Sequence, residues 1–218
     1  GMIGAGKTSI AKLLGQELDS DVFFEQVDDN PLLELFYTAN EQEEQEKRYP
    51  FLLQLTFLSS RFRSIKAALV DKNNVLDRSI YEDWYFTKVN HELGRISELE
   101  FKIYEELLEN MMEELDELPK KAPDLMVYLH GSFDEIVRRI GTRGREFEQD
   151  EALLAYYKKL WEGYDDWVDN HYHASQVLKI DIDRYDVVHN PENAKEVVQL
   201  VKEALKNRDE KLAKQNSF

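Results

Sequence analysis

The chain has 218 residues, 42% hydrophobic and 33% charged, which suffices to bury one sizeable core and fits a single domain over residues 1–218. It has no cysteine, and no apolar run approaches the ~20 residues of a membrane span, which argues against a disulfide framework and a transmembrane helix. Its 44 acidic and 28 basic side chains give a net charge of −16, which disfavours nucleic acids and anionic membranes as partners. No secretory signal opens the sequence, so we expect a cytoplasmic protein whose anionic ligands are small and bind at a local basic cluster.

Four short strand-like runs alternate along the chain with long stretches of helical periodicity. The strand-like runs cover residues 22–25, 74–77, 125–129 and 177–181. The expected helices cover residues 6–18, 30–38, 49–70, 80–93, 97–117, 132–140, 151–171 and 191–207. The strands are mostly apolar, which is typical of a parallel sheet covered by helices on both faces, so we predict an α/β fold. Residues 41–46 are expected to form a solvated loop or helix extension, and residues 208–218 a frayed tail.

The sequence opens with a phosphate-binding motif that runs into an apolar-faced helix. Residues 1–8 satisfy the pattern G-x-x-x-x-G-K-[ST]. In this motif glycines let backbone N–H groups converge on phosphate oxygens at a helix N-terminus, while Lys7 supplies a charge and Thr8 offers a hydroxyl to Mg²⁺. A glycine-rich turn before a helix is the alternative interpretation. The expected ATP-binding residues are Gly1, Met2, Ile3, Gly4, Ala5, Gly6, Lys7, Thr8 and Ser9.

The context of this motif is unusual on its strand side. The motif normally follows a buried strand, yet the sequence begins at the first glycine of the motif. We therefore expect a sheet of about five strands in which the first is missing, with a gap in the sheet beside the site.

Two of the strand-like runs end in charged side chains. Ligands bind beyond the C-terminal ends of strands in parallel sheets, so Glu25, at the end of the first run, is a candidate general base. A solvated glutamate at a strand end is the alternative. The second run ends in Asp77, which is placed to hold Mg²⁺ or its water, and the next residue, Arg78, could steer the acceptor.

Four arginines within eight residues supply the local basic cluster that the acidic background requires. They are Arg138, Arg139, Arg143 and Arg145. We predict that the segment 138–150 is a lid that closes on the phosphates and stabilises charge on the transferred group. A basic helix C-terminus favoured by the helix dipole is the alternative interpretation.

Together these motifs resemble the deoxyribonucleoside kinases, and specifically the bacterial deoxyadenosine/deoxyguanosine kinase branch, over nearly the whole chain. The resemblance rests on five ordered motifs: the phosphate loop, Glu25, residues 48–54 with Arg61 seven positions on, residues 77–83, and residues 139–148. It implies a P-loop kinase fold with an Arg-rich lid, and a homodimer built from the long helices expected at residues 80–93 and 97–117. The apolar stripe of the expected helix 97–117 would serve that dimer, or would simply cover the sheet.

The resemblance also implies roles for individual residues, numbered as in this chain. The implied catalytic residues are Glu25, Arg78, Arg139, Arg143 and Arg145. The motif chemistry described above adds Lys7 as a catalytic residue and Thr8 and Asp77 as metal-binding residues. The implied substrate-binding residues are Glu25 and Arg78 at the 5′-hydroxyl, Gln54, Arg61 and Asp83 at the base, and Tyr37 and Glu148 at the 3′-hydroxyl. Thr87 stands where the family places an aromatic side chain, so the ring that stacks on the base is left open.

We therefore expect phosphorylation of a deoxyribonucleoside 5′-hydroxyl with ATP and Mg²⁺, with deoxyadenosine as first candidate and deoxyguanosine or deoxycytidine as alternatives. A nucleoside monophosphate kinase is a second possibility, although Glu25 and Glu148 would repel the phosphate of its acceptor. A non-catalytic ATP-binding subunit is a third, although it would leave the acidic and basic clusters without a use. Residues 183–185 either flank the ATP adenine or form a plain surface turn.

Overall fold

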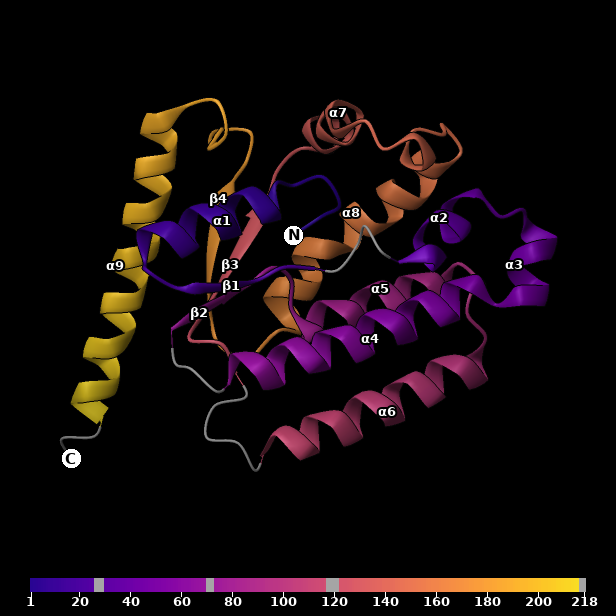
Figure 1. Cartoon of the computed structure of the whole chain (residues 1–218), viewed down its shortest axis with the longest axis horizontal. Coiled ribbons are helices and arrows are strands. Elements are labelled where there is room, and N and C mark those ends of the chain that lie inside the picture. The colour runs from indigo at the N-terminus through magenta and orange to yellow at the C-terminus, as the bar shows by residue number, and fades with distance from the viewer. Residues whose placement is uncertain (26–29, 70–72, 117–121, 216–218) are drawn as a thin grey trace.

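The computed structural model describes residues 1–25, 30–69, 73–116 and 122–215, and Figure 1 shows its ribbon. In chain order the elements are α1 (Lys7–Glu17), β1 (Asp21–Phe23), α2 (Pro31–Thr38), α3 (Glu41–Lys47), α4 (Tyr49–Ala68), β2 (Asn74–Leu76), α5 (Ile80–Glu92), α6 (Glu98–Asp116), β3 (Leu125–His130), α7 (Phe133–Arg143), the short 3₁₀ helix η1 (Glu146–Glu148), α8 (Leu153–Asn170), β4 (Gln176–Asp181) and α9 (Pro191–Gln215). The predicted α/β alternation is confirmed. The helix ends expected at residues 70 and 117, and residues 216–218 of the expected tail, lie outside the described residues.

The four described strands form two parallel pairs. β1 pairs with β2, with Val22 opposite Val75, and β3 pairs with β4, with Val127 opposite Leu178. Within the described part of the chain no strand joins the two pairs. A mostly apolar cavity of about 460 Å³ lies between β2 and β3 and is also lined by α1 and α9. The parallel pairing, the four described strands and the gap between the two pairs agree with the prediction of a sheet of about five strands in which the first is missing.

Two segments are more regular than predicted. The acidic stretch forms α3 because a capping box closes its N-terminus: the Asn40 side chain accepts from Glu43 N, and the Glu43 carboxylate accepts from Asn40 N. The tail predicted to fray from Arg208 instead continues α9 to Gln215, in a stretch rich in good helix formers. Arg208 also forms an ion pair with Asp124, just before β3. Local capping and one long-range contact therefore extend the helical structure.

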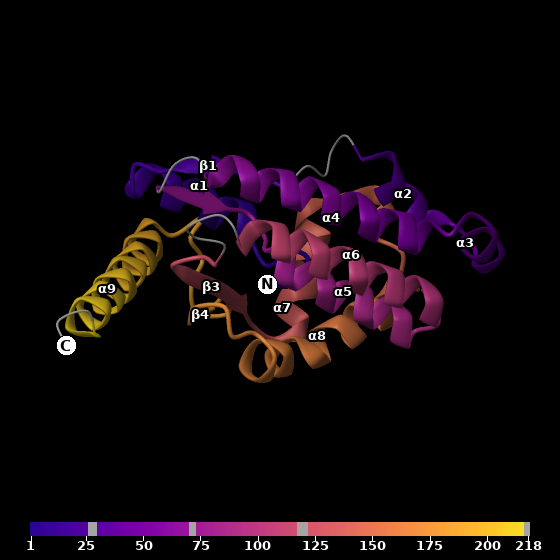
Figure 2. The same ribbon diagram turned by 90° about the horizontal axis from the view of Figure 1, so that it is seen from below.

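Helices α4, α5 and α6 pack against one another, with α6 on the outer side (Figures 1 and 2). Tyr104 of α6 is fully buried in a cluster with Leu58 and Ile65 of α4 and Ile80 of α5. Tyr104, Leu108, Met111 and Met112 of α6 therefore pack on the α4 and α5 side of the helix. Helix α9 lies at the opposite end of the molecule from α2 and α3. No helix in the described ranges combines the length and the apolar character that crossing a membrane requires.

The carboxyl ends of β1 and β2 place the two charged strand ends beside each other. The ladder extends one hydrogen bond past the strands, from Asp77 N to Phe23 O at 2.9 Å. This bond brings the segment carrying Glu25 next to Asp77 and Arg78, at the edge of the sheet where α1 begins. The predicted site residues of three sequence segments thus meet at one edge of the sheet.

Candidate active site

The phosphate-binding loop is formed by the residues that precede α1. Gly4 and Gly6 have φ angles of 79° and 91°, in the left-handed region that favours glycine, so the motif places its glycines where the backbone requires them. Lys7 begins α1 and curls back over the loop, where its Nζ donates to Gly1 O at 2.8 Å and to Met2 O at 2.6 Å. Burial, and next the nearby Arg78, lower the pKa of Lys7 to about 8. The loop therefore holds a buried cation at a helix N-terminus, which is a suitable environment for a phosphate group.

Thr8 and Asp77 meet as the sequence predicted. Thr8 Oγ1 donates to Asp77 Oδ2 at 2.6 Å, while Asp77 Oδ1 is buried and has no hydrogen-bond partner. A hydroxyl and an unpartnered carboxylate oxygen side by side fit a Mg²⁺ ion that takes its other ligands from water and phosphate. No group of three or more histidine, cysteine or acidic side chains that could hold a metal occurs in the described residues.

Glu25 lies between two arginines. Arg61 Nη2 donates to Glu25 Oε1 at 2.8 Å, and Arg78 Nε donates to the same carboxylate at 3.0 Å. Burial acts to raise the pKa of Glu25, but the charges of Arg78 and Arg61 outweigh it and lower the pKa to about 2. Arg78 itself has a φ of +80° and also pairs with Glu82 at 3.3 Å. Glu25 is thus an ionised carboxylate held in a defined position.

Arg61 joins the acceptor side of the site into one buried network. Its Nε donates to Asp83 Oδ2 at 3.1 Å, and its Nη1 donates to Asp77 O at 3.1 Å. Burial raises the pKa of Asp83, and the charge and hydrogen bond of Arg61 oppose that shift. Arg61 and Asp83, both predicted to read the base, thus pair with each other, and the same guanidinium also binds Glu25. One arginine couples the proposed base-reading residue to the proposed general base.

A small cavity of about 60 Å³ collects the predicted substrate residues. It is lined by Glu25, Tyr37, Gln54, Arg78, Asp83 and Glu148, together with the lid residues Arg143 and Arg145 and with Ile3 of the phosphate loop. Arg61 is not among the lining residues, because it lies behind Glu25 and Asp83. These residues come from the phosphate loop, the segments that follow β1 and β2, α2, α4, α5 and the lid. The structure therefore brings together in space a set that the sequence scatters over more than a hundred positions.

Four further aromatic rings line this cavity. They are Phe57 of α4, and Phe36, Phe86 and Tyr156, which the sequence did not identify as site residues. Phe86 follows Asp83 by three positions on α5 and so shares its helix face, a spacing that could have identified it. Its ring lies 4.8 Å from the Arg78 guanidinium carbon. Tyr156 comes from α8, and nothing in its local sequence marks it as a site residue.

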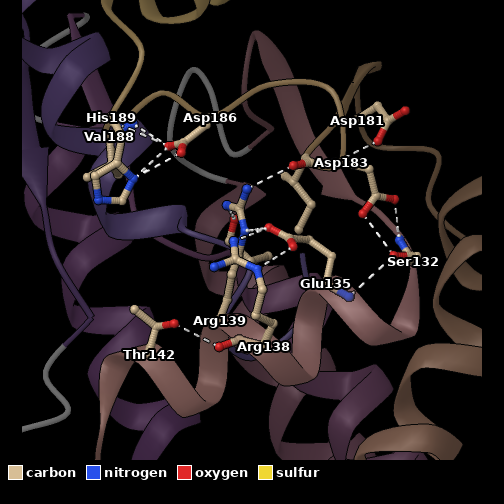
Figure 3. Close-up of polar contacts among 12 residues, drawn as sticks. Ser132, Glu135, Arg138, Arg139, Thr142, Asp181, Asp183, Asp186, Val188 and His189 are labelled. Atoms are coloured by element: carbon tan, nitrogen blue, oxygen red, sulfur yellow. Dashed lines mark hydrogen bonds and ion pairs between the residues drawn. The ribbon is translucent and has the colours of Figure 1, made fainter.

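The lid arginines divide into two groups. Arg143 pairs with the buried Glu148, and Arg145 Nη1 lies 3.6 Å from the same carboxylate. Arg139 instead points toward the phosphate loop: it donates to Ala5 O at 3.3 Å and to Ile182 O at 2.8 Å, and its Nε donates to Glu135. Figure 3 shows Glu135 between Arg138 and Arg139 on α7. Only Arg143 and Arg145 line the acceptor cavity, so the four arginines do not form one uniform cluster.

The loop after β4 is held close to the start of α7. The Asp183 carboxylate accepts from Ser132 N at 2.6 Å and from Ser132 Oγ at 2.8 Å (Figure 3). Arg139 reaches the same loop through Ile182 O. Residues 183–185 therefore lie on the phosphate-loop side of the site and not beside the acceptor cavity.

Comparison with known proteins gives a consistent set of matches. The sequence profile of one family, described as deoxynucleoside kinase, matches residues 1–206. A deoxyguanosine kinase of Lactobacillus johnsonii is 47% identical over 209 residues, which cover 94% of this chain and 90% of the relative. A deoxyadenosine kinase of Lactobacillus acidophilus is 44% identical over 209 residues, which cover 94% of each chain. A solved structure of a deoxyadenosine kinase from M. mycoides with bound dCTP superposes with a TM-score of 0.74 at 23% identity, covers 93% of this chain and 96% of its own, and shows the shared fold.

Proposed function

The chain belongs to the deoxynucleoside kinase family and is a kinase of deoxynucleosides, and on that premise we propose that it transfers the γ-phosphate of ATP to the 5′-hydroxyl of purine deoxyribonucleosides. One observation carries the proposal. Glu25, Arg78 and Gln54 line a single cavity that the phosphate loop also touches through Ile3. The candidate general base Glu25, the cation Arg78 that would steer the hydroxyl, and the amide of Gln54 that would pair with the nucleobase are thus adjacent to a phosphate-binding loop.

In the proposed step, Glu25 takes the proton of the 5′-hydroxyl as that oxygen bonds to the γ-phosphorus and the bond to the ADP oxygen breaks. A carboxylate whose pKa is held at about 2 is a weak base. We therefore infer that the entering hydroxyl displaces one arginine from Glu25 and so raises its basicity. Arg78 is the better candidate for displacement, because its second carboxylate partner is Glu82 at 3.3 Å, whereas Arg61 is fixed by both Asp83 and Asp77 O at 3.1 Å.

Three sets of groups would neutralise the negative charge of the phosphates. Thr8 and Asp77 would hold Mg²⁺, which when bound supplies neutralising charge at the β- and γ-phosphates. Lys7 lies in the loop that would surround those phosphates. Arg143 and Arg145 would leave Glu148 for the transferred group as the lid closes. These groups would therefore act mainly in the transition state.

A hydroxyl acceptor is supported over a phosphate acceptor by the charges around the cavity. The lining arginines Arg78, Arg143 and Arg145 each have a carboxylate partner within 4 Å. A monophosphate entering this cavity would meet Glu25 and Glu148 before it gained a cation of its own. A neutral nucleoside has no such repulsion to overcome.

The choice of purines rests on the base-reading residues and on the relatives. Gln54 is 3% exposed and carries both a donor and an acceptor, so it can make paired hydrogen bonds with a purine edge. The relatives with 47% and 44% identity are named for deoxyguanosine and deoxyadenosine. Phe86 is the ring that we propose to stack on the base, since it lies on the face of α5 that carries Asp83.

We also propose that the enzyme is a homodimer joined through the outer face of α6. Leu99, Ile103 and Leu107 recur every four residues on this helix and are exposed, while Tyr104 faces the core. An exposed apolar stripe of this kind is a common feature of subunit interfaces. Sedimentation analysis of the enzyme and of a Leu99→Glu, Ile103→Glu variant tests this, and a monomer in both would contradict it. A cytoplasmic location remains a prediction from the sequence.

The test of the proposed function is a turnover assay with each of the four deoxyribonucleosides, ATP and Mg²⁺. We expect the highest kcat/KM for deoxyadenosine or deoxyguanosine, with the 5′-monophosphate as product. A preference for thymidine or deoxycytidine would contradict the assignment of purines while leaving the reaction type in place.

A further inference from the structure

Arg95, in the connection between α5 and α6, makes an unusual number of contacts for a residue outside the site. Its Nε donates to Glu44 Oε2 of α3 at 3.1 Å, and its Nη2 also pairs with that carboxylate. Nη2 donates to Phe36 O of α2 at 3.1 Å, and Nη1 donates to Asn90 Oδ1 of α5 at 3.2 Å. Figure 1 shows α3 close to the α5–α6 connection. One guanidinium therefore ties together α2, α3 and α5.

The same guanidinium lies against the back of the cavity wall. Its central carbon is 4.1 Å from the centre of the Phe36 ring and 5.3 Å from that of Tyr156. Both rings line the acceptor cavity. Asn90, which accepts from Arg95, also donates to the Tyr156 hydroxyl at 3.2 Å. Arg95 thus contacts two wall residues directly and one of them also through Asn90, without reaching the cavity itself.

The cavity is smaller than the pockets that usually hold a ligand of nucleoside size. The cavity measures about 60 Å³, whereas pockets for small molecules usually measure roughly 300–1,000 Å³. Helix α2 carries Phe36 and Tyr37, and the Tyr37 ring stacks on Phe147 of the lid at 5.7 Å. The Phe36 carbonyl lies in the last turn of α2, where backbone acceptors lack helical partners, and Arg95 supplies the missing donor. Arg95 therefore links the α2 C-terminus to α3 and α5.

We propose that Arg95 is a positioning residue for the nucleoside site: it fixes the C-terminal end of α2 against α5 and α8, so that Tyr37 and the aromatic wall return to a closed position over the bound nucleoside. This rests on the proposed function, because it assumes that the cavity is the nucleoside site. Arg95 does not line the cavity and acts through Phe36 and Tyr156. It differs in this respect from Arg78, which donates a hydrogen bond directly to the candidate general base, Glu25.

The test compares two carboxylate substitutions that each release one arginine. Glu44→Gln weakens the hold on Arg95, and Glu100→Gln weakens the hold on Arg48, which forms a similar ion pair between the α3–α4 junction and α6. Neither Arg48 nor Glu100 lines the cavity. Arg95→Ala removes the whole set of contacts and is the stronger variant. For each variant we would measure kcat, the KM of the preferred deoxynucleoside, the KM of ATP and the melting temperature.

We expect Arg95→Ala to raise the nucleoside KM by about tenfold and Glu44→Gln by about threefold, with kcat and the KM of ATP within about twofold of the parent enzyme. Glu100→Gln should leave the nucleoside KM unchanged. An unchanged nucleoside KM in Arg95→Ala, or an equal rise in both KM values, would overturn the proposal and leave Arg95 a purely structural residue. If the parent enzyme phosphorylates no deoxynucleoside, the proposed function fails. Calorimetric titration with deoxyguanosine and deoxyadenosine then tests the role of Arg95 separately. Equal dissociation constants for the parent enzyme and Arg95→Ala would overturn the proposal for Arg95.

Discussion

The acceptor side and the lid side of the site both pair arginines with carboxylates, but the pairs differ in burial and in the number of partners of each arginine. On the acceptor side, the Arg61 side chain is 6% exposed and binds Glu25, Asp83 and a backbone carbonyl at once. On the lid side, Arg143 and Arg145 are 34% and 27% exposed and share the single carboxylate of Glu148. The buried network is complete before a substrate binds, whereas the lid arginines can change partners at low cost. The first arrangement suits positioning, and the second suits a charge that is needed only during transfer.

The largest effect should come from the acceptor side. Replacing Glu25 with glutamine should lower kcat by roughly 10²–10⁴-fold, because the 5′-hydroxyl loses its proton acceptor. ATP affinity should stay close to that of the parent enzyme, since Glu25 lies beyond the phosphate loop. Single-turnover transfer and equilibrium ATP binding measure the two quantities separately. An unchanged kcat would remove Glu25 from the proposed role.

The next largest effect should be on stability, and it should also distinguish the two regions. Asp83→Asn leaves Arg61 with one buried carboxylate partner instead of two, so the free energy of unfolding should fall by about 3 kcal/mol. Glu148→Gln, whose arginine partners are partly exposed, should lower it by about 1 kcal/mol or less. Urea unfolding of the two variants gives both numbers. Equal falls in the free energy of unfolding would show that the buried network of Arg61 and the lid ion pairs contribute equally to stability.

On the lid side, Arg143→Ala should lower kcat by about 10²-fold and change the nucleoside KM far less, because the arginine is needed for charge that develops during transfer. Arg138→Ala is the matched control: Arg138 is 61% exposed and its ion pair is with Glu135 on its own helix. Steady-state kinetics of both variants should separate them. A similar fall in kcat for the two would mean that general positive charge, and not Arg143 itself, supports the reaction.

The smallest of these effects concerns pH. The pKa of Glu25 lies at about 2, below its ordinary value of 4.5. A lowered pKa means that the unfolded state binds more protons between those values, so the stabilisation is complete above about pH 4.5 and is lost as the pH falls toward 2. We expect the unfolding free energies of the parent enzyme and of Glu25→Gln to converge by about 2 kcal/mol over that range. Chemical denaturation at several pH values measures this, and a constant difference would contradict it.

Much of the site could be predicted because its chemistry is carried by short segments with a fixed local geometry. The phosphate loop needs glycine at positions with positive φ, and the ends of parallel strands bring Glu25 and Asp77 to one edge. The contact between Thr8 and Asp77 follows from those two facts.

Other features could not be predicted, because they depend on contacts between distant segments. Tyr156 reaches the cavity from α8, and Arg95 stacks behind it from the end of α5. The sequence around Tyr156 does not differ from that around an ordinary buried tyrosine, and the sequence around Arg95 does not differ from that around a surface arginine. Helix α3 was not predicted as a separate helix, for another reason. Its N-terminus is closed by the capping pair Asn40 and Glu43, whereas the prediction considered only the acidic composition of the segment. The division among the lid arginines likewise became visible only when Arg139 was found bound to Ala5 O and Ile182 O.

The most direct test of the account is a competition between two acceptors. The enzyme is given deoxyguanosine and deoxyguanosine 5′-monophosphate at equal concentration, with Mg²⁺ and ATP labelled in the γ-phosphate, and the same pair is repeated with deoxyadenosine. A preformed acceptor side with Glu25 ionised between Arg61 and Arg78 predicts that the label appears in the monophosphate, as transfer to the 5′-hydroxyl. Label in the diphosphate, with the nucleoside left unused, would contradict the account and assign the cavity to a phosphate acceptor.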